Sequence, residues 1–185
     1  IDSGIEQLAR AVALLPDVEF PGATPARRKQ SRTLNANYTR YRLGVAYLRL
    51  GETENCCRQY TAESCIVPIR GGGLHTKQDG SRQAIAQFLE VLKSPRLDNH
   101  DSIQTHLASR WLLNIAYMAV GKYPGGVPER WLIPAAAFDS EFDIGHFRDV
   151  AATAGVNAIG HAGGSVMEDL DGDGRLDIAA SSRGL

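Results

Sequence analysis

The chain has 185 residues, of which 43% are hydrophobic and 22% charged, and its formal net charge at pH 7 is −1. This length allows a hydrophobic core, and the composition is that of a globular protein with one domain or two small ones. A charge so close to zero argues against nucleic acid or an anionic membrane as partner. No apolar run approaches the roughly 20 residues of a transmembrane helix.

The first predicted helix begins a few residues into the chain. The N-terminal sequence IDSGIEQ has neither an initiator methionine nor a signal peptide, so we expect a processed product. Ser3 and Glu6 have the spacing of a capping box, in which each side chain bonds the backbone N–H of the other residue. Four apolar residues recur at helical spacing: Ile5, Leu8, Val12 and Leu15.

Two longer helices carry a repeated sequence. LGVAYLRLGE at 43–52 aligns with LNIAYMAVGK at 113–122. Each segment has apolar residues at i, i+3, i+4 and i+7, which predicts a helix, and its glycine suits a C-terminal cap. We expect helices over about 25–50 and 101–121, the second capped by Asp101. The identical pairs are Leu43/Leu113, Ala46/Ala116, Tyr47/Tyr117 and Gly51/Gly121.

A further helix and two irregular segments complete this part of the chain. SRQAIAQFLEVLK at 81–93 has one apolar face and can begin at Ser81. Residues 52–80 form an insertion rich in cysteine and glycine. After Gly121 the sequence changes to proline, glycine and aromatic residues, which predicts a coil-rich connector over 123–162.

All three cysteines, Cys56, Cys57 and Cys65, lie within ten residues of the insertion. Such clustering predicts one local disulfide with one thiol left over, and it indicates an oxidising compartment. The spacing leaves open whether Cys56 or Cys57 pairs with Cys65. A Cys–His nucleophile, such as Cys57 with His75, would instead make the protein a thiol-dependent hydrolase, which is the least favoured function.

An acidic loop lies near the C-terminus, in the sequence MEDLDGDGRLDIAASS at 167–182. Its pattern D-x-D-x-D-G-x-x-D brings several carboxylates to one point of a tight turn, where a divalent cation relieves their repulsion. Hard oxygen ligands suit Ca²⁺ best. Position 180 is alanine, so the glutamate of an EF-hand is missing. The alternative is a solvated acidic turn. The predicted ligands are the carboxylates of Asp169, Asp171, Asp173 and Asp177 and the backbone carbonyl of Arg175.

The helical part, residues 1–122, resembles tetratricopeptide repeats. The residues that carry the resemblance are Leu43, Gly44, Tyr47 and Gly51 in a first helix, and Ala84, Phe88 and Pro95 in and after a second. The insertion departs from the 34-residue period of the family. Asn114 replaces the packing glycine in the second copy. The resemblance implies a helix-pair scaffold that presents surfaces to partners.

The run SVMEDLDGDGRLDIAASS resembles one FG-GAP (VCBS-type) repeat, in which such a loop joins two strands of a propeller blade. Together with LRLGETENC, ESCIVPIRGGGLHT and YPGGVPERWLIP, it makes nearly the whole chain similar to the N-terminal part of secreted bacterial proteins that join tetratricopeptide-like helices to FG-GAP repeats and often to an ASPIC/UnbV module. The resemblance implies an extracytoplasmic, calcium-dependent binding or structural protein without established catalytic residues. It also favours Cys56 as the partner of Cys65.

We therefore expect a mainly α protein with three regions. These are a tetratricopeptide-like array over 1–122, the coil-rich connector over 123–162, and a single FG-GAP-like β element with a calcium loop over 163–185. The expected function is that of a non-enzymatic, secreted or cell-surface structural module that self-associates head-to-tail, into filaments if the assembly does not close. The alternative is an adhesion or ligand-binding N-terminal fragment of a longer propeller protein.

Overall fold

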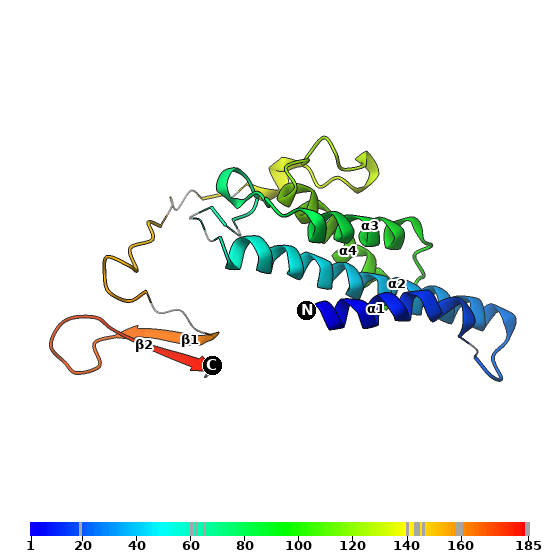
Figure 1. Cartoon of the computed structure of the whole chain (residues 1–185), viewed down its shortest axis with the longest axis horizontal. Coiled ribbons are helices and arrows are strands. Elements are labelled where there is room, and N and C mark those ends of the chain that lie inside the picture. The colour runs from blue at the N-terminus through cyan, green and yellow to red at the C-terminus, as the bar shows by residue number, and fades with distance from the viewer. Residues whose placement is uncertain are drawn as a thin grey trace. The chain divides into compact units, whose positions relative to one another are not determined.

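The computed structural model divides into two units, Ile1–Asp143 and Ile144–Leu185. The first is helical and the second contains a two-stranded antiparallel sheet, so the mainly α prediction is confirmed at this level (Figure 1). Within the described part of the chain, no helix has both the length and the apolar character needed to cross a membrane. The residues that the structure describes are 1–18, 20–59, 61, 63–64, 66–139, 141–142, 145, 147–157 and 161–183.

Helix α1, Asp2–Leu14, packs against α2 through its buried residue Ile5. Its N-cap is Ile1, and no side chain makes a capping hydrogen bond. The predicted capping box of Ser3 and Glu6 is therefore wrong. The helix begins before Ser3, which places both residues inside the first turns instead of at the boundary where a cap acts.

Helix α2, Pro25–Glu52, begins where the hydroxyl of Thr24 accepts a hydrogen bond from the backbone of Arg27 at 3.4 Å. The prediction of Gly51 as the C-terminal cap is wrong, because α2 runs on to Glu52, its cap is Thr53, and a π-helical turn follows over Thr53–Cys57. A Cβ atom on Gly80 would lie 2.8 Å from the backbone nitrogen of Gly51. The glycines at these two positions thus allow α2 and the start of α3 to approach closely.

Helices α3, Asp79–Lys93, and α4, His100–Ala119, complete the helical unit. The cap of α4 is Asn99, whose side chain accepts a hydrogen bond from Ser102 at 2.9 Å, so the prediction of Asp101 as the cap is wrong. Asp101 lies within the first turn, since the helix starts one residue before it. Gly121 follows α4 with a φ of +69°, as expected for a C-terminal glycine.

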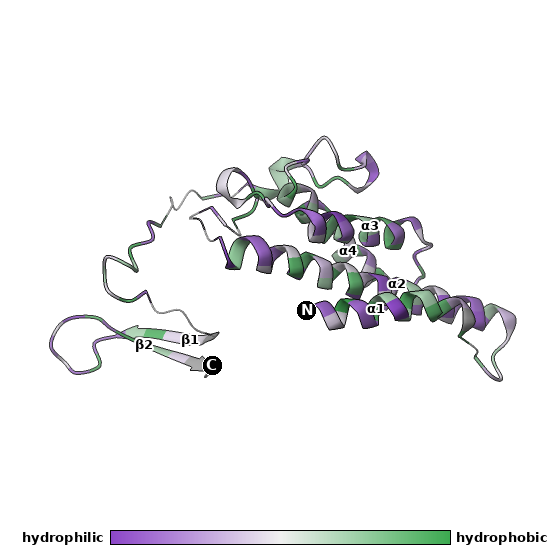
Figure 2. Cartoon of the chain, in the orientation of Figure 1, coloured by the Kyte–Doolittle hydropathy of each residue, from purple (hydrophilic) through white to green (hydrophobic). Residues whose placement is uncertain are grey.

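The core of the helical unit lies among α2, α3 and α4, whose ribbons alternate between apolar and polar residues in Figure 2. The side chains of Phe88 and Leu113 are fully buried there. Gly44 lies directly against Phe88, and a Cβ atom at that position would come within 2.6 Å of the ring. The other buried members of the core are Leu48, Ala84, Leu92, Ala116 and Val127.

Two buried asparagines attach irregular segments to this core. The amide of Asn55 donates to the carbonyls of Gly51 and Lys77, at 2.8 and 2.9 Å, and so holds the insertion in place. The side chain of Asn114 is completely buried. It donates to the carbonyl of Trp131 and accepts from the backbone of Ile133, each at 3.0 Å. The first part of the segment expected to be a connector is therefore packed against α4.

The second unit contains strands β1, His161–Glu168, and β2, Asp177–Arg183. They pair antiparallel, with Val166 opposite Ala179 and Glu168 opposite Asp177, and the register shifts between Ala162 and Ser165. None of the side chains described over 163–181 is buried. This unit therefore lacks a hydrophobic core among its described residues.

Candidate metal centre

The predicted metal ligands lie on the loop that joins β1 to β2. Glu168 and Asp177 form the last pair of the ladder, so Asp169 and Asp177 stand on opposite sides of the hairpin end. Asp171 lies between them in the loop. The backbone N–H of Leu170 donates to Oδ2 of Asp177 at 3.0 Å, which ties the two sides of the loop together.

Three of the four predicted aspartates converge. Asp169, Asp171 and Asp177 each offer one carboxylate oxygen, and these oxygens lie within 4.8 Å of one another. Two oxygens bound to one Ca²⁺ can be at most about 5.2 Å apart, twice the longest common Ca–O distance. The three carboxylates can therefore hold a single calcium ion with little rearrangement.

Asp169 organises the loop around its own carboxylate. Its Oδ1 accepts hydrogen bonds from the backbone of Gly172 and Asp173, at 2.8 and 3.1 Å, and its Oδ2 accepts one from Gly174 at 2.9 Å. Gly172 and Gly174 have φ values of +77° and +82°, which favour glycine. The two glycines in the sequence pattern are thus required by the turn that wraps the backbone around Asp169.

Asp173 lies outside the group of three. Its Oδ1 accepts a hydrogen bond from the backbone of Arg175 at 2.8 Å, which stabilises the next turn of the loop. Asp173 and the carbonyl of Arg175 remain predicted ligands. Asp171 has a similar local bond, since its Oδ1 accepts from the backbone of Asp173 at 3.0 Å.

The electrostatics of the loop favour a cation. Two like charges about 4 Å apart repel by about 1 kcal/mol in water and by more near a protein surface. Within the described part of the chain, the ion pairs are Arg49–Glu52 and Glu90–Lys93, both in the helical unit. The carboxylates of the loop therefore have no basic side chain as a salt-bridge partner there, and a divalent ion would supply the missing positive charge.

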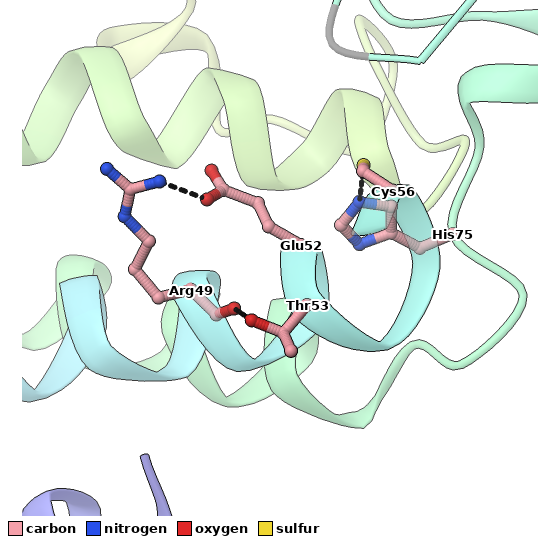
Figure 3. A network of polar contacts seen from close by, with 5 residues as sticks. All are labelled: Arg49, Glu52, Thr53, Cys56 and His75. Atoms are coloured by element: carbon pink, nitrogen blue, oxygen red, sulfur yellow. Dashed lines mark hydrogen bonds and ion pairs between the residues drawn. The ribbon is translucent and has the colours of Figure 1, made fainter. Parts of the chain in front are cut away.

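A second polar cluster lies in the helical unit around His75, which is 3% exposed (Figure 3). Nδ1 of its ring lies 2.8 Å from the hydroxyl of Ser81, and Nε2 lies 3.6 Å from the sulfur of Cys56. Burial lowers the pKa of His75, and the negative charge of Glu52 opposes that shift. In Figure 3 the carboxylate of Glu52 is directed toward Arg49, with which it forms an ion pair at 2.7 Å.

The cysteine that lies beside His75 is not the one suggested for a hydrolase, which was Cys57. Cys56 faces His75, whereas Cys57 is exposed. Sequence reasoning missed Ser81 as a partner of His75, because a serine at the start of a predicted helix is usually read as a cap. The expected disulfide between Cys56 and Cys65 lies outside the described residues, since Cys65 is not among them.

Among the residues that the structure describes, the acidic loop is thus where three side chains with the same ligand chemistry come together. Comparisons of this chain with protein-family models, with curated proteins and with solved structures found no match.

Proposed function

We propose that this protein is a non-enzymatic calcium-binding structural module, in which Ca²⁺ rigidifies the loop between β1 and β2. The observation that supports the proposal is the convergence of Asp169, Asp171 and Asp177, with oxygens within 4.8 Å of one another. The loop backbone is already closed around Asp169 by hydrogen bonds. Part of the ordering that binding requires is therefore present before the ion arrives.

The chemistry of the loop favours Ca²⁺ over other common metals. Zn²⁺ prefers histidine and cysteine ligands, and the converging side chains are all aspartates. Oxygens on one Mg²⁺ are at most about 4.2 Å apart and must approach an octahedron closely. A largely exposed loop of carboxylates accommodates the larger, more flexible shell of Ca²⁺ more readily than the strict octahedron of Mg²⁺.

Calorimetric titration of the full chain with Ca²⁺ tests this proposal. The variant Asp171→Asn keeps the oxygen that accepts from Asp173 but removes the charge. We expect its affinity for Ca²⁺ to fall by about tenfold or more. Asp149→Asn is the matched control, because Oδ1 of Asp149 also accepts from the backbone two residues on, that of Ala151 at 3.0 Å. No binding at millimolar Ca²⁺, or equal binding by the Asp171 variant, contradicts the proposal.

The same proposal includes an extracytoplasmic location and self-association. Extracellular calcium-binding modules have dissociation constants for Ca²⁺ of about 10⁻⁴–10⁻³ M. We expect the exposed acidic loop to bind Ca²⁺ with an affinity in this range. The hairpin supports self-association because two isolated strands are marginal in water and their edges can pair with another chain. The apolar side chains of Val166, Met167 and Ile178 are each more than half exposed.

Light scattering measures this association directly. We expect the full chain at tens of micromolar to form oligomers in Ca²⁺ and to dissociate in EDTA, through head-to-tail contacts that form rings or filaments. A monomer in Ca²⁺ contradicts self-association. It favours the alternative function, that of an adhesion or ligand-binding portion of a longer propeller protein.

A further inference from the structure

A groove with a volume of about 670 Å³ lies between α2 and α4, in the helical unit. Its walls come from the stretch Leu34–Tyr41 of α2 and the stretch His100–Ala108 of α4. The volume falls within the range of about 300–1,000 Å³ that is usual for sites of small ligands. Neither the acidic loop nor the His75 cluster contributes to it.

Most of the residues that line the groove have uncharged polar side chains, although the surface that they expose is more apolar than polar because it includes tyrosine rings. Carboxamides and hydroxyls can both donate and accept hydrogen bonds. Asp101 is the acidic residue of the lining, and no lysine or arginine belongs to the lining as described. The lining itself therefore offers anionic ligands such as phosphates and nucleic acids no permanently charged basic side chain, and the nearby guanidinium of Arg42 is already bonded to the hydroxyl of Tyr38. The carboxamide and hydroxyl side chains of the lining include Asn35, Asn37, Gln104, Tyr38, Tyr41 and Thr105.

Asn37, one of the residues that line the groove, has a buried side-chain amide whose nitrogen lacks a hydrogen-bond partner among the described residues. The residue is 4% exposed, and within the described part of the chain its Nδ2 has no hydrogen-bond acceptor. Most buried polar groups in proteins are paired, because an unpaired one loses its bonds to water without replacement. Asn37 belongs to the lining of the groove, so a ligand oxygen that reaches its amide nitrogen would supply the missing acceptor.

Two tyrosine rings form a surface beside this amide. Tyr38 is 52% exposed, and its ring lies 6.5 Å from that of Tyr41. Tyr41 packs against Phe88 of the core, also at 6.5 Å between ring centres. The guanidinium of Arg42 donates to the hydroxyl of Tyr38 at 3.2 Å. The rings are thus held in place before a ligand binds, which reduces the entropy lost on binding.

We propose that this groove binds an uncharged oligosaccharide. The C–H face of a sugar ring packs on an aromatic face, and its hydroxyls bond the carboxamides and hydroxyls of the lining. Other ligands fit this lining less well. A helical peptide anchors its apolar side chains among aliphatic residues, of which the lining as described has only Leu34 and Ala108, and a phosphopeptide requires an arginine cluster. A proline-rich peptide, which also docks on aromatic rings, is the competing ligand that the experiment must distinguish.

Calorimetric titration of the full chain with cellohexaose, maltohexaose and N-acetylchitohexaose tests the proposal. We expect at least one of these oligosaccharides to bind at millimolar concentration or below. Tyr38→Ala removes an exposed ring, and we expect it to weaken binding by about tenfold or more. Gln104→Ala removes an exposed amide from the opposite wall and should weaken binding by about threefold or more. Phe147→Ala, which removes an 88% exposed ring from the other unit, should leave binding unchanged.

Three results would overturn the proposal. The first is the absence of binding by all three oligosaccharides. The second is oligosaccharide binding that Tyr38→Ala leaves unchanged while circular dichroism shows the variant to be folded. The third is binding of a polyproline decapeptide in place of the oligosaccharides, with loss of that binding in Tyr38→Ala. Because the groove and the acidic loop share no residue, Asp171→Asn should bind the oligosaccharide normally, whatever its affinity for Ca²⁺.

Discussion

The two units of this protein are ordered by different means. In the helical unit, apolar side chains such as Phe88 and Leu113 are fully removed from water, and the hydrophobic effect stabilises the packing of α2, α3 and α4. In the hairpin, Val166 and Ile178 remain 55% and 52% exposed. Its order depends on the strand ladder and on hydrogen bonds within the acidic loop. A ligand or partner can therefore add far more stability to the hairpin than to the helices.

The two units also use polar side chains differently. Asn55 and Asn114 are buried, and neutral amides suit them because a buried charge would carry a large desolvation cost. Asp169 makes comparable bonds to backbone N–H groups, but it does so in a partly exposed loop where a charge is tolerated. Aspartate can also bind a cation there, which an asparagine in the core cannot do as well.

The largest expected effect comes from the core. We expect Phe88→Ala to lower the free energy of unfolding of the helical unit by about 3–5 kcal/mol, since it leaves a cavity at the centre of the packing. Urea denaturation followed by circular dichroism measures the change. Phe147→Ala, at an exposed position of the other unit, should change stability by less than about 0.5 kcal/mol. Equal effects of the two variants on the free energy of unfolding would contradict this difference between the units.

Removal of Ca²⁺ should affect the hairpin selectively. Binding to the folded state alone adds about 2.7 kcal/mol when the ion is at a hundred times its dissociation constant. We expect EDTA to accelerate amide hydrogen exchange in β1 and β2 while exchange in α3 and α4 stays the same. If exchange in the hairpin is the same with and without Ca²⁺, the ion has no role in its order.

Asn114 tests whether the segment after α4 belongs to the helical unit. We expect Asn114→Ala to destabilise the protein by about 1–3 kcal/mol, because it removes the acceptor of the Ile133 N–H and one of the two donors to the Trp131 carbonyl, the other being Arg110. Thermal unfolding measures this loss of stability. The control is Asn157→Ala, which alters an exposed residue of the other unit. Similar melting temperatures for the two variants would show that the buried amide contributes nothing.

The smallest expected effect is a dependence on pH from His75. Burial lowers its pKa below the usual value of 6.5, so the unfolded chain takes up a proton at a higher pH than the folded protein does. The stability that His75 contributes is therefore fully present above about pH 6.5 and is lost as the pH falls toward the lower, folded-state pKa. We expect urea denaturation to show a weaker loss of stability between pH 7 and 5 in His75→Gln than in the wild type. His100→Gln, at an exposed position, should retain the wild-type slope.

Local patterns predicted part of this architecture. Apolar periodicity predicted α2, α3 and α4 to within a few residues, and the glycine after α4 was correctly predicted as its C-terminal cap. The same reasoning predicted Asp101 and Gly51 as helix caps, and both predictions were wrong. The pattern of a cap is short and ambiguous. Gly51, moreover, is needed because α3 packs closely against α2 at this point, and a contact between two helices cannot be read from a local pattern.

The sequence by itself determined the helices and the spacing of the carboxylates in the acidic loop, because both depend on residues near one another along the chain. Only the tertiary structure decided which side chains meet across elements. It placed Cys56 and Ser81 on opposite sides of the His75 ring, and it brought the tyrosines of α2 opposite α4 in one groove. Such contacts depend on how whole helices pack, and packing is the sum of many weak interactions over a large surface.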